Sequence, residues 1–417
     1  MINKIIKNQY LLNMINKIIS LLLGILSSAF ITRYMGSSLK GEYSYIVSVS
    51  SVVSIVLNFG IYQAYPYQIK QGLKNAQKKF LNIFAMQFIL YIIISGTIAI
   101  CTKDFKLAGI ALIIPFNVLV SQVTMIGMVE FPTFRSFALI IVAFVNVILC
   151  YITFKFLSRN LYYSIAILLI KDVIFIIMVL IKARVFPNPF IIDVKLFFET
   201  FKFGLLPMLT TLLLNMNYKM DIVMLRQFDT SAAVGIYSVG VSIADYLWLI
   251  PDSFKEVLFS RAAKENSVNS FNLSIKLSTI MTTVISIGVF SLGRNVISFL
   301  YGSEFFNSFD ITVILLIGIP FMSIFKIISP LFVSQGKTKL YFIILLVTIV
   351  INFVLNYILI AVMSLSGAAF ATIISQIICG MFTLYMYIKI NNIRTSSVFM
   401  FNRNEIDNIK SLLIKNN

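Results

Sequence analysis

The amino-acid sequence predicts an all-α polytopic membrane protein with about twelve transmembrane helices. Of the 417 residues, 59% are hydrophobic and 12% are charged, and the mean hydropathy is +0.94. A soluble domain is about half apolar and about a quarter charged, so this composition indicates many membrane spans. About twelve helices with roughly 20 residues each in the hydrocarbon would use roughly 58% of the chain, which matches its hydrophobic content.

Apolar runs of spanning length predict transmembrane segments at 12–34, 43–65, 81–101, 107–127, 137–157, 161–181, 204–225, 234–256, 277–300, 310–333, 341–362 and 367–390. The first run follows Lys4 and Lys7 but reaches Arg33 without a small-residue cleavage site, so it is interpreted as a helix and not as a signal peptide. The connections are too short to fold a separate catalytic domain. We therefore expect the functional residues to lie among the helices.

Lys and Arg are concentrated in alternate connections between the predicted spans. The stretches 66–80 and 182–203 are the most basic of these connections. Because cytoplasmic loops of membrane proteins collect Lys and Arg, this distribution predicts that both termini are cytoplasmic. The same rule accounts for the formal charge of +18 without a nucleic-acid partner.

The scarcity of certain residue types excludes several kinds of chemistry. The chain has no histidine, which excludes imidazole acid–base catalysis and histidine metal ligands. Cys101, Cys150 and Cys379 are far apart and lie in apolar stretches, so neither a Cys-x-x-Cys site nor a disulfide framework is expected. We expect neither a metal nor a cofactor.

A short motif occurs twice in the chain at a constant offset of 194 residues. Residues 37–48 read SSLKGEYSYIVS and residues 231–242 read SAAVGIYSVGVS, with six of twelve positions identical. A second pair, NVILCY at 146–151 and NFVLNY at 352–357, recurs at offset 206. The order of the two motifs is the same in each half, which predicts an internal repeat of six spans.

The repeat predicts the organisation of the chain. Six crossings return the chain to the same side of the membrane, so the two halves should have parallel orientation and be related by an axis along the membrane normal. We predict a six-helix lobe at 1–190, a cytoplasmic linker at 191–203, a second six-helix lobe at 204–390 and a cytoplasmic tail at 391–417. Transporters with such repeats bind substrate between them.

Span 204–225 carries the densest group of polar residues inside the predicted membrane. A charge at the centre of a spanning helix costs about 2.5–3.5 kcal/mol on insertion scales, so it usually faces a cavity or a partner. At 100° per residue, one face carries Asn215, Tyr218, Lys219 and, further along, Arg226, and the other side carries Asn217 and Asp221. These residues either line a cavity or form a structural contact between helices.

Other spans carry further charged residues. Lys17 either extends its amine to the cytoplasmic interface or faces a cavity. Arg33 either anchors the end of the first span or contributes to the same cavity. Asp245 and Lys326 are interpreted as lone intramembrane charges. Each of these two is expected to face the interior of the bundle.

A series of segments along the chain carries a family resemblance. They read FITRYMGSSLKGEYS (30–44), KFGLLPMLTTLLLNMNYKMDIVML (202–225), VGIYSVGVSIADYL (234–247), YGSEFF (301–306), PLFVSQGK (330–337) and GAAFATIISQ (367–376). Together they resemble Wzx-type polysaccharide repeat-unit flippases, which belong to the multidrug/oligosaccharidyl-lipid/polysaccharide exporter (MOP) superfamily. The likeness extends over nearly the whole chain, and the glycine–tyrosine turn in the third segment is its most specific part.

The resemblance implies twelve helices in two six-helix lobes around a central cationic cavity. The implied substrate is an oligosaccharide repeat unit linked through diphosphate to a polyprenol. It would be flipped to the periplasmic leaflet of the bacterial inner membrane for O-antigen (lipopolysaccharide) or capsule assembly. The implied partners are this lipid-linked oligosaccharide and the lipid bilayer, with the polysaccharide polymerase machinery as a further candidate. The implied activity is transport and not enzyme catalysis.

A flippase for such a substrate must carry a diphosphate across hydrocarbon. Lys and Arg side chains in a wet cavity can neutralise the diphosphate charge. We expect diphosphate contacts from Lys17, Arg33, Lys219 and Lys326, and hydrogen bonds to sugars from Asn215, Asn217 and Tyr218. Asp221 and Asp245 would couple transport to protons or cations, or would only hold the lysines in place.

Three other functions stay open at this point. A drug or cation antiporter of the same superfamily would favour an acidic cavity, whereas the intramembrane candidates include more Lys than Asp. A membrane polysaccharide polymerase would be expected to have a large periplasmic loop, and the longest connections are predicted to be cytoplasmic. A structural scaffold is disfavoured because intramembrane charges are costly without a use.

Overall fold

The computed structural model describes residues 2–262 and 268–401. These residues are almost entirely helical and include no strand. Nine of their helices are long and apolar enough to cross a membrane, and the bent pair α8 (Ser231–Tyr246) and α9 (Leu249–Ala262) provides a tenth. Since α1 (Ile2–Leu57) and α12 (Thr338–Asn391) are each broken once into two segments, the prediction of about twelve transmembrane helices is confirmed.

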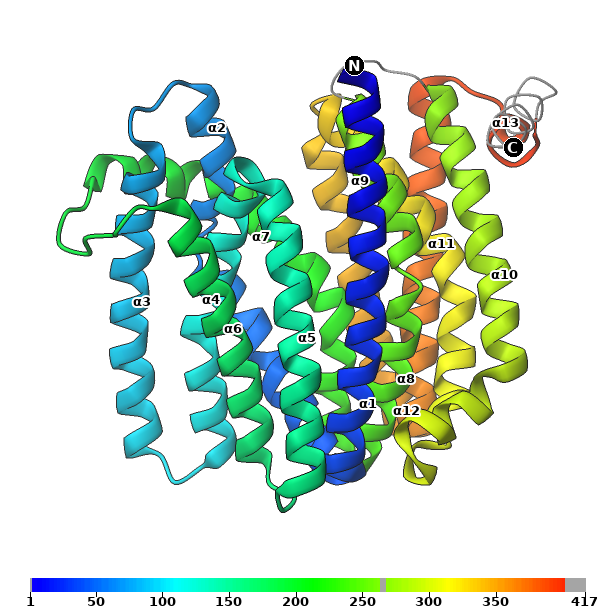
Figure 1. The fold of residues 1–417 in the computed structure, drawn as a ribbon. Helices are drawn as coiled ribbons and strands as arrows, with labels where there is room; N and C mark the ends of the chain where they lie inside the picture. The colour runs from blue at the N-terminus through cyan, green and yellow to red at the C-terminus, as the bar shows by residue number, and fades with distance from the viewer. Residues whose placement is uncertain (1, 263–267, 402–417) are drawn as a thin grey trace. The chain divides into compact units, whose positions relative to one another are not determined.

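The chain forms two compact units (Figure 1). The N-terminal unit contains the residues up to Ser238 and Phe299–Phe305, and the C-terminal unit contains Val239–Ser298 and the residues from Phe306 onward. The elements of the N-terminal unit, besides α1 and the first half of α8, are η1 (Ile61–Ala64), α2 (Tyr65–Lys70), α3 (Ala76–Cys101), α4 (Phe105–Glu130), α5 (Pro132–Phe156), α6 (Leu161–Ala183), α7 (Val194–Phe228) and η2 (Ser303–Phe305).

The C-terminal unit contains α9, α10 (Val268–Tyr301, up to Ser298), α11 (Ser308–Ser334), α12 and α13 (Thr395–Phe399). Of its candidate spans, α11 is the most deeply buried, with 72% of its apolar window inside the protein. The two halves of α12 are joined by a hydrogen bond from the amide of Asn352 to Ser375 Oγ at 3.2 Å. The predicted tail 391–417 lies outside the described residues from 402 onward.

The break in α1 reduces the predicted connection 35–42 to a single residue. Only Gly36 departs from helical geometry, with φ 68° and ψ 179°. Glycine adopts this left-handed φ without the steric penalty that a Cβ imposes. In Figure 1 the dark blue first half of α1 runs toward one end of the unit, and the lighter blue second half returns from it. Residues 37–42, which were expected to form a loop, are therefore helical, and this changes the environment of Lys40.

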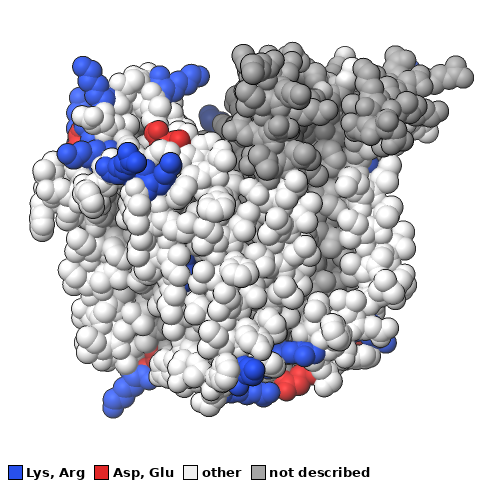
Figure 2. Space-filling view, viewed as in Figure 1, with Lys and Arg blue, Asp and Glu red and all other residues white. Residues whose placement is uncertain are grey.

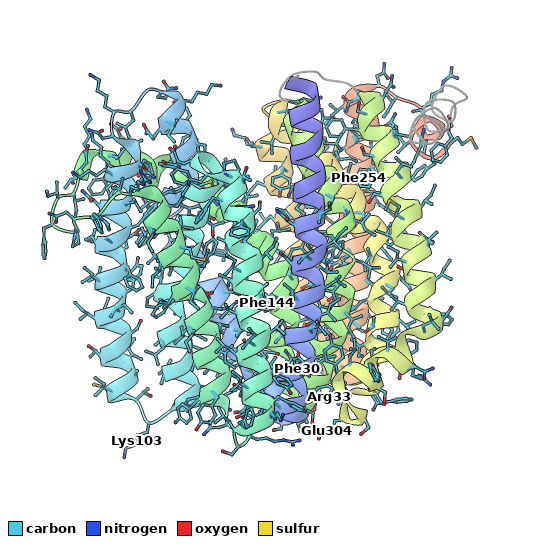
Figure 3. All side chains as sticks on the ribbon, in the orientation of Figure 1. Phe30, Arg33, Lys103, Phe144, Phe254 and Glu304 are labelled. Atoms are coloured by element: carbon cyan, nitrogen blue, oxygen red, sulfur yellow. The ribbon has the colours of Figure 1, made fainter. Side chains whose placement is uncertain are left out.

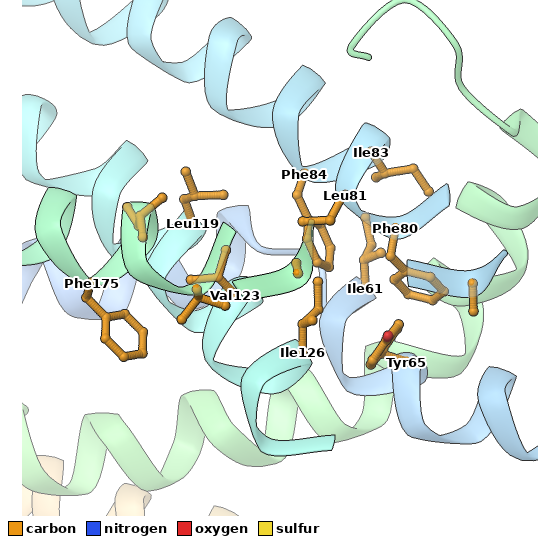
Figure 4. Packing of buried hydrophobic residues seen from close by; sticks show 14 of the residues in the cluster. Ile61, Tyr65, Phe80, Leu81, Ile83, Phe84, Leu119, Val123, Ile126 and Phe175 are labelled. Atoms are coloured by element: carbon orange, nitrogen blue, oxygen red, sulfur yellow. The ribbon is translucent and has the colours of Figure 1, made fainter. Parts of the chain in front are cut away.

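A cluster of buried apolar side chains fills the N-terminal unit around η1, α3 and α4 (Figure 4). The rings of Tyr65 and Phe80 meet edge to face with centroids 5.0 Å apart, and the Phe84 ring lies 5.9 Å from that of Phe80. The Tyr65 hydroxyl donates to Glu130 Oε1 at 2.7 Å. Burial, and then this hydrogen bond to a carboxylate, raise the pKa of Tyr65 above its usual range.

The start of α7 is fixed by Asp193, so residues 194–203 of the predicted linker are helical. The Asp193 carboxylate accepts the N–H of Leu196 at 3.0 Å, which satisfies an open donor of the first turn. Lys79 Nζ lies 2.8 Å from the other carboxylate oxygen. The hydrogen bond from Lys79, and then that from Leu196, lower the pKa of Asp193. This arrangement ties α7 to α3.

Two glycines allow α7 to pack directly against the corner between α1 and η1. A Cβ built on Gly60 would lie 2.2 Å from the carbonyl oxygen of Gly204, and one built on Gly204 would lie 2.3 Å from that of Gly60. Such distances leave no room for any side chain, so the two backbones are in contact. Small residues permit this close approach between membrane helices.

Charged side chains on the visible face gather at the ends of the helices of the N-terminal unit. Figure 2 shows blue and red atoms at both ends of these helices and almost only white atoms along their middle. The middle carries many exposed hydrophobic side chains, among them Ile93, Phe144 and Ile177. This distribution is expected for helices whose outer surface faces hydrocarbon.

Candidate functional site

The two copies of the repeated motif contact each other within the N-terminal unit. Ser44 Oγ on the second half of α1 donates a hydrogen bond to Ser238 Oγ on α8 at 2.9 Å, and these residues are 194 positions apart. Both side chains are buried. The offset of the predicted repeat therefore joins two residues in space as well as in sequence.

The neighbouring glycines make the same contact in both directions. A Cβ built on Gly41 would lie 1.7 Å from the carbonyl oxygen of Ser231, and one built on Gly235 would lie 2.0 Å from that of Ser37. Ser37 and Ser231 occupy the same position in the two copies of the motif, and so do the two glycines. The contact of each glycine is therefore equivalent to that of the other. This reciprocity is the property of a two-fold interface. It positions α7, which precedes α8, beside the second half of α1.

One side of α7 is buried and polar. Asn217 is 1% exposed and Asp221 is 2% exposed, one helical turn apart. The Tyr237 hydroxyl on α8 donates a hydrogen bond to Asp221 Oδ2. Within the described part of the chain, neither polar atom of the Asn217 amide has a hydrogen-bond partner. A buried amide without partners is costly, so this side of the helix has unmet hydrogen-bonding capacity.

The other side of α7 carries the residues that helical spacing groups together, and it is half-buried. Asn215, Tyr218, Lys219 and Arg226 all have intermediate exposure. The Asn215 amide donates back to the carbonyl of Thr211 in its own helix at 3.2 Å. Among the described residues, Lys219 takes part in no ion pair. Its charge is therefore available to an anion.

Lys40 is a cationic residue that the sequence reasoning missed. It is 8% exposed, and its Nζ lies 5.5 Å from the centroid of the Tyr43 ring. Its charge repels that of Lys219, so the two amines lie within electrostatic range of each other. Lys40 also forms no ion pair with any described residue. Its position inside the repeated motif could have drawn attention to Lys40. It was missed because residues 37–42 were expected to form a loop and not a helix.

An apolar groove lies between the second half of α1 and α7. Its volume is about 180 Å³. The lining residues are Val49, Val52 and Val53 of α1 and Met216, Met220 and Val223 of α7. Lys219 follows Met216 by three positions and precedes Val223 by four, which makes it a neighbour of both on the helix surface. A half-buried cation therefore borders an apolar groove.

Lys17 and Arg33 lie on the first half of α1. Their separation of 16 residues corresponds to about 24 Å along a helix. Lys17 has intermediate exposure, whereas Arg33 is exposed and donates a hydrogen bond to the carbonyl of Phe299. Arg33 therefore holds the segment before η2 against the turn of α1.

Glu304 lies at the same turn and completes it. Its Oε2 accepts the N–H of Ser37, the first residue after the break, at 2.8 Å. A Cβ built on Gly36 would lie 3.1 Å from this oxygen and 3.4 Å from Arg159 Nη1. Figure 3 shows Arg33 and Glu304 together at this end of α1. The carboxylate thus acts as an N-cap for the second half of the helix.

The C-terminal unit holds Lys326 in a different environment. Its Nζ lies 3.0 Å and 3.1 Å from the two carboxylate oxygens of Asp252 and 4.4 Å from the centroid of the Trp248 ring. The expectation that Lys326 is a lone intramembrane charge is therefore wrong, because Asp252 of α9 supplies a carboxylate partner. Asp245 accepts a hydrogen bond from Trp248 Nε1 at 2.9 Å and contributes to the same cluster.

The predicted site residues thus fall into separate groups. The α7 residues and Lys40 lie in the N-terminal unit, whereas Lys326, Asp252 and Asp245 form a cluster in the C-terminal unit. Arg33 belongs to the turn at Gly36. Asp252 was missed because it lies next to Pro251 near the end of a predicted span, where a charge is unremarkable.

The arrangement of helices is that of a known class of membrane transporters. The fold matches those of the MATE and MurJ transporters of the MOP superfamily. Neither a protein-family model nor a curated protein matches the chain. The transporter-like fold implied by the sequence resemblance is therefore present.

Three solved structures illustrate the similarity. The lipid II flippase MurJ in an inward closed conformation aligns with a TM-score of 0.70 and 17% identity, covering 93% of this chain and 89% of that one. An inward-facing multidrug resistance transporter of the MATE family aligns with a TM-score of 0.68 and 12% identity, covering 89% and 95%. A MOP-superfamily transporter from Pyrococcus furiosus, whose reversed pocket polarity suggested a different function, aligns with a TM-score of 0.57 and 14% identity, covering 92% and 94%.

Proposed function

We propose that the protein is a flippase for polyprenyl-diphosphate-linked oligosaccharide repeat units. It would act in the bacterial inner membrane, by alternating access, in the assembly of O-antigen or capsular polysaccharide. The observation that carries the proposal is Lys219, a half-buried cation in the middle of α7 with no ion-pair partner among the described residues and with Lys40 in electrostatic range. Such a site attracts a polyanion and repels a cation.

The likeness to MurJ supports this choice of substrate class. MurJ is named as a flippase of lipid II, and this chain shares its fold over most of its length. The diphosphate of the substrate would contact Lys219, with Lys17, Arg33 and Lys326 as further contacts along the path. The sugars would form hydrogen bonds, as donors or acceptors, with Asn215, Asn217 and Tyr218.

The carboxylates would have a supporting role. Asp221, which accepts a hydrogen bond from Tyr237, is a candidate for coupling transport to a proton or cation. Asp245 is the corresponding candidate in the C-terminal unit. In both units the carboxylates would also hold neighbouring polar groups in place, as Asp252 does for Lys326.

Export in a strain that lacks the gene tests the proposal. We expect lipid-linked repeat units to accumulate on the cytoplasmic leaflet while surface polysaccharide disappears. The wild-type gene should restore export, Lys219→Ala should not, and Lys219→Arg should restore part of it because the charge is retained. All three proteins should insert in equal amounts. Normal surface polysaccharide in the deletion strain, together with drug efflux by the purified protein, would instead favour an antiporter.

A further inference from the structure

The groove between α1 and α7 combines two properties that one ligand class shares. Its six lining side chains are all apolar, and Lys219 borders it without a carboxylate partner among the described residues. An apolar surface favours hydrocarbon, and a half-buried amine favours an anion. A ligand that satisfies both must carry an anionic group directly attached to a hydrocarbon chain.

The dimensions of the groove limit how much hydrocarbon it can take. A volume of about 180 Å³ corresponds to about six water-sized groups at roughly 30 Å³ each. This is enough for the first few carbons of a chain and far too little for a whole lipid tail. Two of the six lining residues are methionines, whose flexible side chains adjust to irregular apolar shapes.

We propose that this groove binds the first isoprene unit of a phosphorylated isoprenoid, with its phosphoryl group against Lys219. The inference rests on the proposed function and adds that the lipid itself, and not only its diphosphate and sugars, is recognised. Lys40, whose charge interacts with that of Lys219, adds positive charge near the phosphoryl group. A cation without an ion-pair partner among the described residues, beside an apolar surface, is the complement of this substrate and of neither a free sugar nor a cationic drug.

Short soluble ligands test the proposal on the purified wild-type protein. Isopentenyl diphosphate carries one isoprene unit, and methyl diphosphate carries the same charged group without it. In a calorimetric titration, we expect isopentenyl diphosphate to bind at least tenfold more tightly than methyl diphosphate. The further increase in affinity from isopentenyl to geranyl diphosphate should be much smaller. Equal affinity of the methyl and isopentenyl compounds would overturn the proposal.

Two substitutions separate the charge from the groove. Lys219→Met should weaken both diphosphates at least tenfold. Val52→Phe, which fills the groove, should weaken only the isopentenyl compound and bring it to the affinity of methyl diphosphate. Val56→Phe is the matched control, because Val56 lies one turn further along the same helix, is 40% exposed and does not line the groove.

The outcomes also separate this inference from the proposed function. If wild type flips lipid-linked oligosaccharide in vesicles but binds both short ligands equally, the groove is not a prenyl site and the flippase proposal stands. If wild type neither flips the lipid nor binds any diphosphate, the proposed function itself is wrong. Equal binding of isopentenyl diphosphate to wild type and Val52→Phe, with both proteins folded, would contradict the assignment to this groove. Tight binding of phosphatidylglycerol with no isoprenoid preference would mean that the groove holds a bilayer lipid instead.

Discussion

Ser44 and Ser238, which occupy the same position in the two copies of the repeat, are hydrogen bonded to each other at 2.9 Å. In a two-fold arrangement only residues on the axis can meet their own counterparts. These two serines therefore mark where the axis between the repeated motifs passes. Gly41 and Gly235, each three residues before its serine, allow the helices to come this close.

Substitution at Gly41 should be destabilising because its space is occupied by backbone. Gly41→Ala would place a methyl group 1.7 Å from the Ser231 carbonyl oxygen, so the helices must separate. We expect a loss of about 1–3 kcal/mol of stability, seen as a lower Tm in detergent. Gly96→Ala is the control, because nothing lies within 4 Å of a Cβ at Gly96. An equal Tm for the two variants would contradict the contact.

The ion pair between Lys326 and Asp252 should depend on both partners. The Lys326 side chain is 10% exposed, so Asp252→Asn leaves a buried amine without its carboxylate. We expect a loss of roughly 1–3 kcal/mol, which is below the range for a fully buried pair because Asp252 is partly exposed. The double variant Lys326→Met with Asp252→Asn should be more stable than Asp252→Asn alone. A thermal-unfolding double-mutant cycle measures this coupling, and additive effects would argue against the pair.

The N-cap of α7 should make stability depend on acidity. The hydrogen bond from Lys79, and then that from Leu196, lower the pKa of Asp193 below its ordinary value. Its contribution to stability is therefore complete above the ordinary Asp range, near about pH 4, and is lost as the pH falls through the lowered value. The Tm difference between wild type and Asp193→Asn should be constant near neutrality and shrink in acid. A difference that stays constant down to low pH would contradict this assignment.

Glu304 should stabilise the second half of α1 from outside the helix. Glu304→Ala removes the acceptor for the Ser37 N–H, which we expect to cost about 1 kcal/mol, as for other N-caps. Glu304→Gln keeps an acceptor oxygen and should lose less. Glu199→Ala on the exposed side of α7 is the control. Hydrogen exchange at residues 37–40 is the direct readout, and unchanged protection in Glu304→Ala would refute the cap.

The membrane architecture could be predicted from the sequence because a segment that crosses hydrocarbon must be long and apolar. The spans and the fold followed from apolar runs and from the quoted motifs. Helix breaks did not follow, because they depend on single residues such as Gly36 and Ser364. A helix break at one residue leaves no compositional signal that would distinguish it from a short loop.

Charged groups were predicted less completely than helices for a related reason. The faces of α7 were predicted correctly because helical spacing alone decides them. Lys40 was missed because its burial depends on the helix continuing past Gly36. The partner of Lys326 was missed because Asp252 is 74 positions away in sequence and is brought near only by packing. Long-range pairing is a property of the tertiary structure.

The contact between Ser37 and Glu304 also determines when the turn of α1 can be completed during synthesis of the chain. The two residues are 267 positions apart, so at about 5–20 residues per second the ribosome adds Glu304 roughly 13–53 s after Ser37. During that interval the returning half of α1 has no carboxylate at its N-terminus. The first hairpin of the protein is therefore among the earliest structures to be synthesised and among the last to be completed.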